Sequence, residues 1–74
     1  MKNLIEVIVK ELVDDDSKVV VEEENNDGEV LITIKLDDKD KGKVIGRNGS
    51  IINSIRTIAK ACAIKEDVKV SIKI

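Results

Sequence analysis

Aliphatic positions recur along the chain with two different periods. Helical spacing over Asn3–Val13 and again over Ser50–Ala63 predicts two helices. An alternation of aliphatic and polar residues predicts strands over Glu29–Leu36 and Asp67–Ile74. Over Lys18–Glu24, a run of β-branched residues followed by charged ones predicts a strand near a sheet edge. These elements must pack their aliphatic faces against one another, because a single helix or strand cannot bury its own.

The first predicted helix has one aliphatic stripe and two aliphatic residues outside it. Asn3 is the expected N-cap, and Asp14–Ser17 ends the helix with residues that favour turns. Val7 and Val13 lie outside the stripe and either border the core or contact a partner; we favour the border of the core. The stripe consists of Leu4, Ile5, Ile8, Val9 and Leu12.

The turn-forming stretch Asn25–Gly28 joins the first two predicted strands. Its residues tolerate positive φ, so the two strands are expected to form an antiparallel hairpin. After the second strand, Asp38 or Asp40 is expected to cap a short helical turn that runs to Val44. The expected inward-facing strand residues are Val30, Ile32, Ile34 and Leu36 in the second strand and Val68, Val70, Ile72 and Ile74 in the last.

The predicted elements follow the order α-β-β-α-α-β. The two helices between the second and third strands form a crossover, which favours a parallel strand pair with a right-handed connection. The expected fold class is therefore α+β, with a three-stranded mixed sheet, helices packed on one face and a largely polar opposite face. A chain of 74 residues is expected to form one domain, spanning residues 1–74.

The composition excludes several classes of function. There is no His and a single Cys, Cys62, so a zinc site, a disulfide framework and His-based acid–base chemistry are excluded. No nucleophile–base pair is evident, and we expect neither an enzyme nor a bound cofactor or metal. Charged residues interrupt the apolar N-terminal stretch, which argues against a signal peptide or a membrane span. Together with the lone thiol, this favours a cytoplasmic protein.

The charge is divided between the two halves of the chain. Residues 1–40 hold 5 Lys or Arg and 13 Asp or Glu, a net of −8, and residues 41–74 hold 8 and 2, a net of +6, in agreement with the total of −2. This asymmetry indicates either one electropositive face on an acidic body or two ordinary solvated surfaces.

The stretch KVIGRNGSII, Lys43–Ile52, places two glycines immediately before a predicted helix. Gly49 and Ser50 would lie at the N-terminus of that helix, where backbone N–H groups lack partners and the helix dipole is positive. Glycine lets an anion approach this backbone closely, and Arg47 and Asn48 add a positive charge and a hydrogen-bonding side chain. A phosphodiester suits this combination. We call Gly46–Gly49 the glycine loop.

A structural explanation of the same glycines is also open. Gly46 could end one helix as its C-cap, and Gly49 could merely relax the turn into the next helix. This explanation leaves the neighbouring cations Lys41, Lys43 and Arg47 without a role.

The stretch Val44–Gly49, followed by Ile52 and Ile55, resembles the signature loop of the KH domain, whose GXXG segment clamps the backbone of about four nucleotides. The order of the elements resembles the type II, prokaryotic arrangement. Over its whole length the chain is similar to the small stand-alone bacterial KH proteins of the KhpA type. The match over Gly42–Ala61 is much more specific than the tetrapeptide alone.

The resemblance implies RNA binding in a shallow groove. The glycine loop would hold the phosphates, and the strand Val68–Ile74 would form one wall. Where the family motif often carries a basic residue this chain has Asn53, and Arg56 is expected to supply the charge instead. Ile52 and Ile55 are equally expected to pack in the core, with only an edge available to a base. The implied RNA-binding residues are Gly46, Arg47, Asn48, Gly49, Lys43, Ile45, Ser50, Ile52 and Arg56. Of these, Lys43, Ile45 and Ile52 would form the wall opposite the strand, together with Val44 and Ile55.

The absence of aromatic residues limits the expected affinity. Base–aromatic stacking, worth about 1–3 kcal/mol per base, is excluded, so one copy should bind single-stranded RNA weakly. Useful affinity would then require a homodimer or a partner. The resemblance implies a multidomain KH protein of the KhpB (Jag) type as that partner, and a role as RNA chaperone or post-transcriptional regulator. A ribosome-assembly factor and a KH scaffold for protein–protein interaction are the alternatives, and Arg47 argues against a loop that has lost RNA binding.

Overall fold

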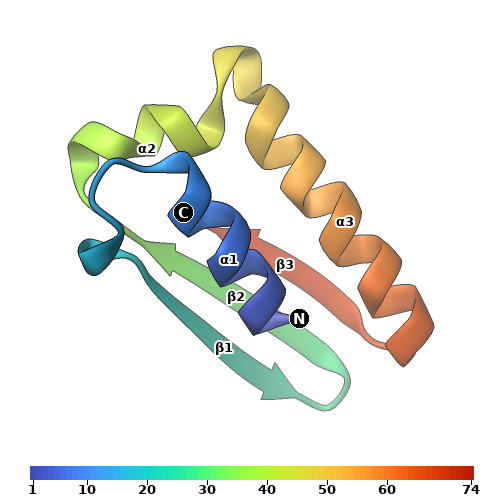
Figure 1. Ribbon diagram of the computed structural model, residues 1–74. Coiled ribbons are helices and arrows are strands. Elements are labelled where there is room, and N and C mark those ends of the chain that lie inside the picture. The colour runs from blue at the N-terminus through green and yellow to red at the C-terminus, as the bar shows by residue number, and fades with distance from the viewer.

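Helices cover one face of a three-stranded sheet in the computed structural model, which describes residues 1–74 (Figure 1). The strand order is β1-β2-β3, with β1 antiparallel to β2 and β2 parallel to β3, as predicted. None of the helices is both long and apolar enough to cross a lipid bilayer. The helices are α1 (Lys2–Leu12), α2 (Asp38–Ile45) and α3 (Ser50–Glu66), and the strands are β1 (Val20–Asn26), β2 (Glu29–Lys35) and β3 (Lys69–Lys73).

A two-residue turn joins β1 to β2. Asp27 and Gly28 have φ of 51° and 82°, the pair of positive values that matches the right-handed twist of a hairpin. The turn sets the register, which pairs Asn26 with Glu29. Because Asn25 and Asn26 belong to β1, the turn is shorter and the strand ends later than predicted. The strand also begins later, at Val20 instead of Lys18.

The core lies between the sheet and the helices. It contains aliphatic residues from every helix and strand, and the predicted inward face of β2 is confirmed because Val30, Ile32 and Ile34 are all buried. Leu36, Val68, Val70 and Ile74 are only partly buried at the margin of this core. The buried cluster is Ile5, Val9, Val19, Val21, Val30, Ile32, Ile34, Val44, Ile52, Ile55, Ala59 and Ile72.

Three predictions about α1 are wrong in detail. The helix begins at Lys2, after an N-cap at Met1 that makes no side-chain hydrogen bond, so Asn3 is inside the helix rather than its cap. Leu4, placed in the buried stripe, is 42% exposed, because the core takes only the face centred on Ile5 and Val9. Val7 is 60% exposed, so it lies on the outer surface rather than at the border of the core.

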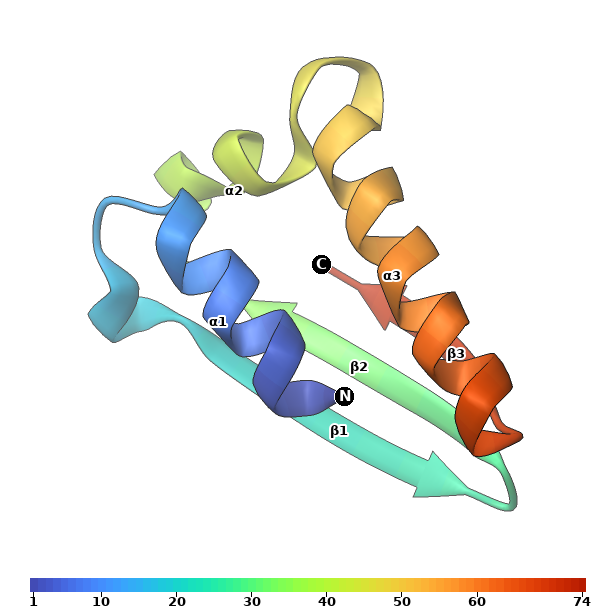
Figure 2. The ribbon, with the colours of Figure 1, turned by 45° about the vertical axis from the view of Figure 1, so that its right-hand side comes forward.

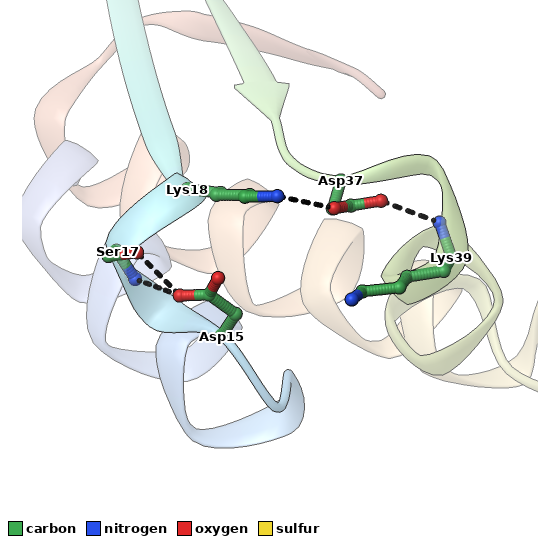
Figure 3. A network of polar contacts seen from close by, with 5 residues as sticks. All are labelled: Asp15, Ser17, Lys18, Asp37 and Lys39. Carbon is green, nitrogen blue, oxygen red and sulfur yellow. Dashed lines mark hydrogen bonds and ion pairs between the residues drawn. The ribbon is translucent and has the colours of Figure 1, made fainter.

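The N-cap of α2 is Asp37, not Asp38 or Asp40. Its carboxylate accepts a hydrogen bond from the Lys39 backbone N–H at 3.1 Å and another from the Lys18 Nζ at 2.9 Å (Figure 3). These two donors, Lys18 first, hold the pKa of the Asp37 carboxyl below its usual value. The network ties the start of α2 to the segment before β1. Asp40 lies within α2 and is 1% exposed.

The helix α3 is one turn longer than predicted. It ends at Glu66, and Asp67 adopts the left-handed conformation, with φ of 57°, that turns the chain into β3. Ile64, in the added turn, is 80% exposed, so the hydrophobic periodicity stops before the helix does. The return strand β3 lies at the edge of the sheet and runs back alongside α3 (Figure 2).

Candidate nucleic-acid interface

The glycine loop is a tight turn between α2 and α3. Gly46 has φ of 77° and ψ of 175°, and Asn48 and Gly49 have φ of 55° and 74°. Glycine adopts such values without strain, and Asn tolerates the left-handed region better than most residues. Backbone bonds from Gly46 N to Gly42 O (2.9 Å) and from Gly49 N to Gly46 O (3.2 Å) hold the turn closed.

The local structure favours glycine at both Gly46 and Gly49. A Cβ at Gly46 would lie 2.7 Å from Ile51 Cγ1 and 2.9 Å from Ile51 N, closer than real contacts allow. At Gly49 the nearest such contact would be 3.5 Å, so there the positive φ alone favours glycine. The structural explanation therefore accounts for the glycines. It does not account for the charged and polar residues between them.

Arg47 and Asn48 are exposed and unengaged. Arg47 makes no ion pair and Asn48 no side-chain hydrogen bond. They lie beside the N-terminus of α3, which has no side-chain cap and no acidic residue in its first turn. Both features leave the positive end of the helix dipole uncompensated. Ser50, also exposed, directs its backbone N–H to Arg47 O and so helps to close the loop.

Lys43 is engaged within the protein. Its Nζ pairs with Asp14, at the end of α1, and lies 3.7 Å from Asp40 Oδ1. The hydrogen bond with Asp14 raises the pKa of Lys43, and it lowers the pKa of Asp14. The other oxygen of Asp40, Oδ2, is buried without a partner. Lys43 therefore links α2 to the segment after α1 through an exposed ion pair, and its place in the wall stays a prediction.

Little of the predicted aliphatic wall reaches the surface. Ile52 and Ile55 are 4% and 2% exposed, and Val44 is fully buried. Only Ile45 keeps an accessible part, since it is half-buried at the end of α2. The core interpretation of Ile52 therefore describes its environment better than the binding interpretation.

A hollow of about 260 Å³ lies between α3 and β3, lined by Arg56, Lys60, Val70, Ser71 and Ile72; we call it the α3–β3 groove. Arg56 reaches across it. Its Nη1 donates to Asn53 Oδ1 at 3.3 Å, and its Nη2 donates to the Ile72 carbonyl oxygen at 3.4 Å. Sequence reasoning selected Arg56 and this strand but missed Lys60. Its position four residues after Arg56, on the same side of a helix, was the available signal.

The charge division of the sequence is only partly a division in space, since Lys69 lines the same surface hollows as Glu24, Glu29 and Asp67. The positive residues of the glycine loop, α3 and β3 make no ion pair, so no carboxylate neutralises their charge. Acidic residues occupy β1 and the turn at the opposite edge of the sheet. These positive residues are Arg47, Arg56, Lys60, Lys65, Lys69 and Lys73.

Along the chain, α1 and β1 come first, and α2, the glycine loop and α3 then connect β2 to its parallel partner β3. This order of elements defines a type II KH fold. The chain belongs to the family described as KhpA/KhpB, KH domain, whose model matches residues 2–74.

Relatives of similar length match all or nearly all of this chain. A protein of Clostridium perfringens named RNA-binding protein KhpA is 45% identical over 74 residues, which cover all of this chain and 99% of the relative. Proteins of the same name from Clostridium acetobutylicum and Borreliella burgdorferi are 42% and 38% identical, covering 100% and 96% of this chain and 99% and 87% of their own. No solved structure matches the chain.

Proposed function

We propose that this chain is an RNA-binding protein that holds about four nucleotides of single-stranded RNA along the glycine loop and the α3–β3 groove. The observation that carries the proposal is the unpaired Arg47 beside the uncapped N-terminus of α3. The α3–β3 groove, lined by two further cations, lies farther along the same helix. The name shared by its relatives, RNA-binding protein KhpA, supports the same function. A binding module of this kind performs no catalysis.

The two parts of the site would act on different parts of the RNA. In the glycine loop, the exposed side chains of Arg47 and Asn48 present donors to phosphate oxygens beside the uncapped, positive end of α3, and such contacts position a strand without reading its sequence. The α3–β3 groove, with aliphatic Val70 and Ile72 on one side, is where unstacked bases would lie. Without an aromatic platform the bases gain little from stacking, so binding by one copy is expected to be weak.

We expect the binding constant to fall as salt rises, because each phosphate contact releases condensed counterions. For single strands the logarithm of the constant falls with the logarithm of salt concentration by about 0.7 per neutralised phosphate, so two or three contacts give a slope between about −1.4 and −2.1. Fluorescence anisotropy with an eight-nucleotide RNA at several salt concentrations measures this slope, and a blunt duplex of the same sequence is the control. Absence of binding at low salt would favour the protein-interaction scaffold instead.

The proposed function includes assembly into a homodimer or a heterodimer with a multidomain KH protein of the KhpB type. Exposed aliphatic side chains on the helical layer supply a surface for this contact: Leu4 is 42% exposed, Val7 60% and Ile58 41%. Two linked copies raise the effective concentration of the second RNA site, which offsets the weakness of one. The cellular role that we propose for such weak, paired binding is that of an RNA chaperone or post-transcriptional regulator.

Replacing Ile58 by Glu is expected to shift the protein to a monomer, because a carboxylate would be desolvated in an apolar contact. Light scattering coupled to size-exclusion chromatography measures the mass over a range of protein concentrations. Ile64→Glu is the matched control, since Ile64 lies outside the buried stripe in the last turns of α3 and is 80% exposed. A wild-type protein that stays monomeric at every concentration excludes the homodimer and leaves the heterodimer.

A further inference from the structure

We propose that Asn53 and the Ile72 carbonyl group fix the guanidinium of Arg56 so that it reads a base edge carrying two adjacent hydrogen-bond acceptors, that of cytosine or guanine. This inference rests on the proposed function, because it concerns the base held in the α3–β3 groove. It adds a specificity-determining residue, Arg56, and a positioning residue, Asn53.

The geometry fixes the direction of Arg56. Asn53 precedes it by three residues on α3, and its Oδ1 accepts from Nη1 at 3.3 Å; the Ile72 carbonyl, on β3, accepts from Nη2 at 3.4 Å. The two acceptors come from different elements, so the guanidinium spans the groove. Arg56 is half-buried, whereas an unconstrained arginine would extend into solvent.

The identity of residue 53 matters for this arrangement. An amide oxygen accepts from the guanidinium without neutralising it, and no carboxylate pairs with Arg56. A basic residue at this position would repel the guanidinium instead. Asn53 therefore orients Arg56, and the chain lacks the phosphate contact that a basic residue at position 53 could make.

The remaining donors of Arg56 select by chemistry. A guanidinium has five N–H donors and no acceptor, so two internal bonds leave donors for a ligand. Guanine presents O6 and N7 side by side, and cytosine presents O2 and N3, so both accept two parallel bonds. Adenine and uracil place an N–H donor next to each acceptor on the corresponding edges, which leaves one guanidinium donor facing another donor.

A host RNA of eight uridines, with one central position changed to C, G or A, tests the inference by competition binding. We expect the C or G version to bind about tenfold or more tightly than the U and A versions. An RNA with 7-deazaguanine at the central position distinguishes recognition of guanine from recognition of cytosine. It loses the tighter binding of the G version only if Arg56 contacts guanine N7. The Arg56→Lys variant should bind all four RNAs within about twofold of one another, because a single ammonium cannot make the paired bonds.

Asn53 is tested by the ratio of affinities rather than by affinity itself. Asn53→Leu should lose the base preference, whereas Asn53→Gln, which retains an uncharged amide acceptor, should keep it; a merely structural role would change stability in both and leave the ratio alone. Lys65→Met is the control outside the groove. Wild-type protein that binds the four RNAs equally overturns the inference and leaves the proposed function standing. Absence of binding to every RNA overturns both.

Discussion

Replacing Arg47 and Asn48 together by aspartate is expected to abolish binding of single-stranded RNA, with a loss of at least about 100-fold at low salt. The substitution removes the unpaired cation of the glycine loop and places two carboxylates where phosphates would lie. Like charges juxtaposed across an interface cost several kcal/mol, and about 2.7 kcal/mol is a factor of 100. Anisotropy with a short labelled RNA measures the change.

The fold should survive this double substitution. Both side chains are exposed, and the left-handed backbone of residue 48 suits aspartate, since Asp27 and Asp67 adopt φ of 51° and 57° in the same chain. Circular dichroism and a urea titration verify this point.

A matched variant separates a local effect from a general one. The substitution lowers the net charge by three, and so does changing Ile64 and Lys65 to aspartate at the exposed end of α3. We expect this control to weaken RNA binding only slightly. Equal losses in both variants would mean that bulk charge rather than the glycine loop determines affinity, and unchanged binding in the loop variant would exclude the loop as the site.

The elements of the fold could be predicted wherever hydrophobic periodicity reports burial. The alternation in β2 predicted its buried face because every second residue contacts the core. The last turn of α3 could not be predicted in this way, since Ile64 there is exposed and the turn persists through backbone bonds and the left-handed Asp67. The wrong N-cap at Asn3 has a similar cause, because α1 begins without any side-chain cap. The capping preference of Asn could not locate the start of α1, because no side chain caps this helix.

The candidate site was predictable only in its local part. The glycine loop is contiguous, and its pattern resembles a known signature. The pairing of Lys43 with Asp14 joins residues 29 apart in sequence, so no local pattern could show that this lysine is engaged. The contact of Arg56 with the Ile72 carbonyl likewise exists only because β3 returns alongside α3. Sequence therefore indicated which residues could contact RNA, and tertiary structure decides which of them are free to do so.

The largest expected effect on stability comes from Gly46→Ala. Its φ of 77° with ψ of 175° lies in a region essentially restricted to glycine, which costs other residues about 1–3 kcal/mol. The added Cβ would also lie 2.7 Å from Ile51 Cγ1 and 2.9 Å from Ile51 N, and an overpacked contact costs about 1–3 kcal/mol more. We expect a loss of about 2–6 kcal/mol in the free energy of unfolding. A chain of 74 residues has about 4–11 kcal/mol in total, so this is a large share.

Urea unfolding followed by circular dichroism measures the change, and Gly42→Ala provides the control four residues earlier. Gly42 lies inside α2 and is exposed, and a Cβ added there would meet no atom within 4 Å, so alanine should raise stability by up to about 1 kcal/mol. Gly49→Ala should fall between the two, because it meets a positive φ of 74° but no close contact. This order of stabilities distinguishes Gly46, where a side chain would clash with Ile51 of α3, from Gly49, where only the positive φ disfavours other residues. A Gly46→Ala protein as stable as the wild type would contradict the close approach of the loop to Ile51.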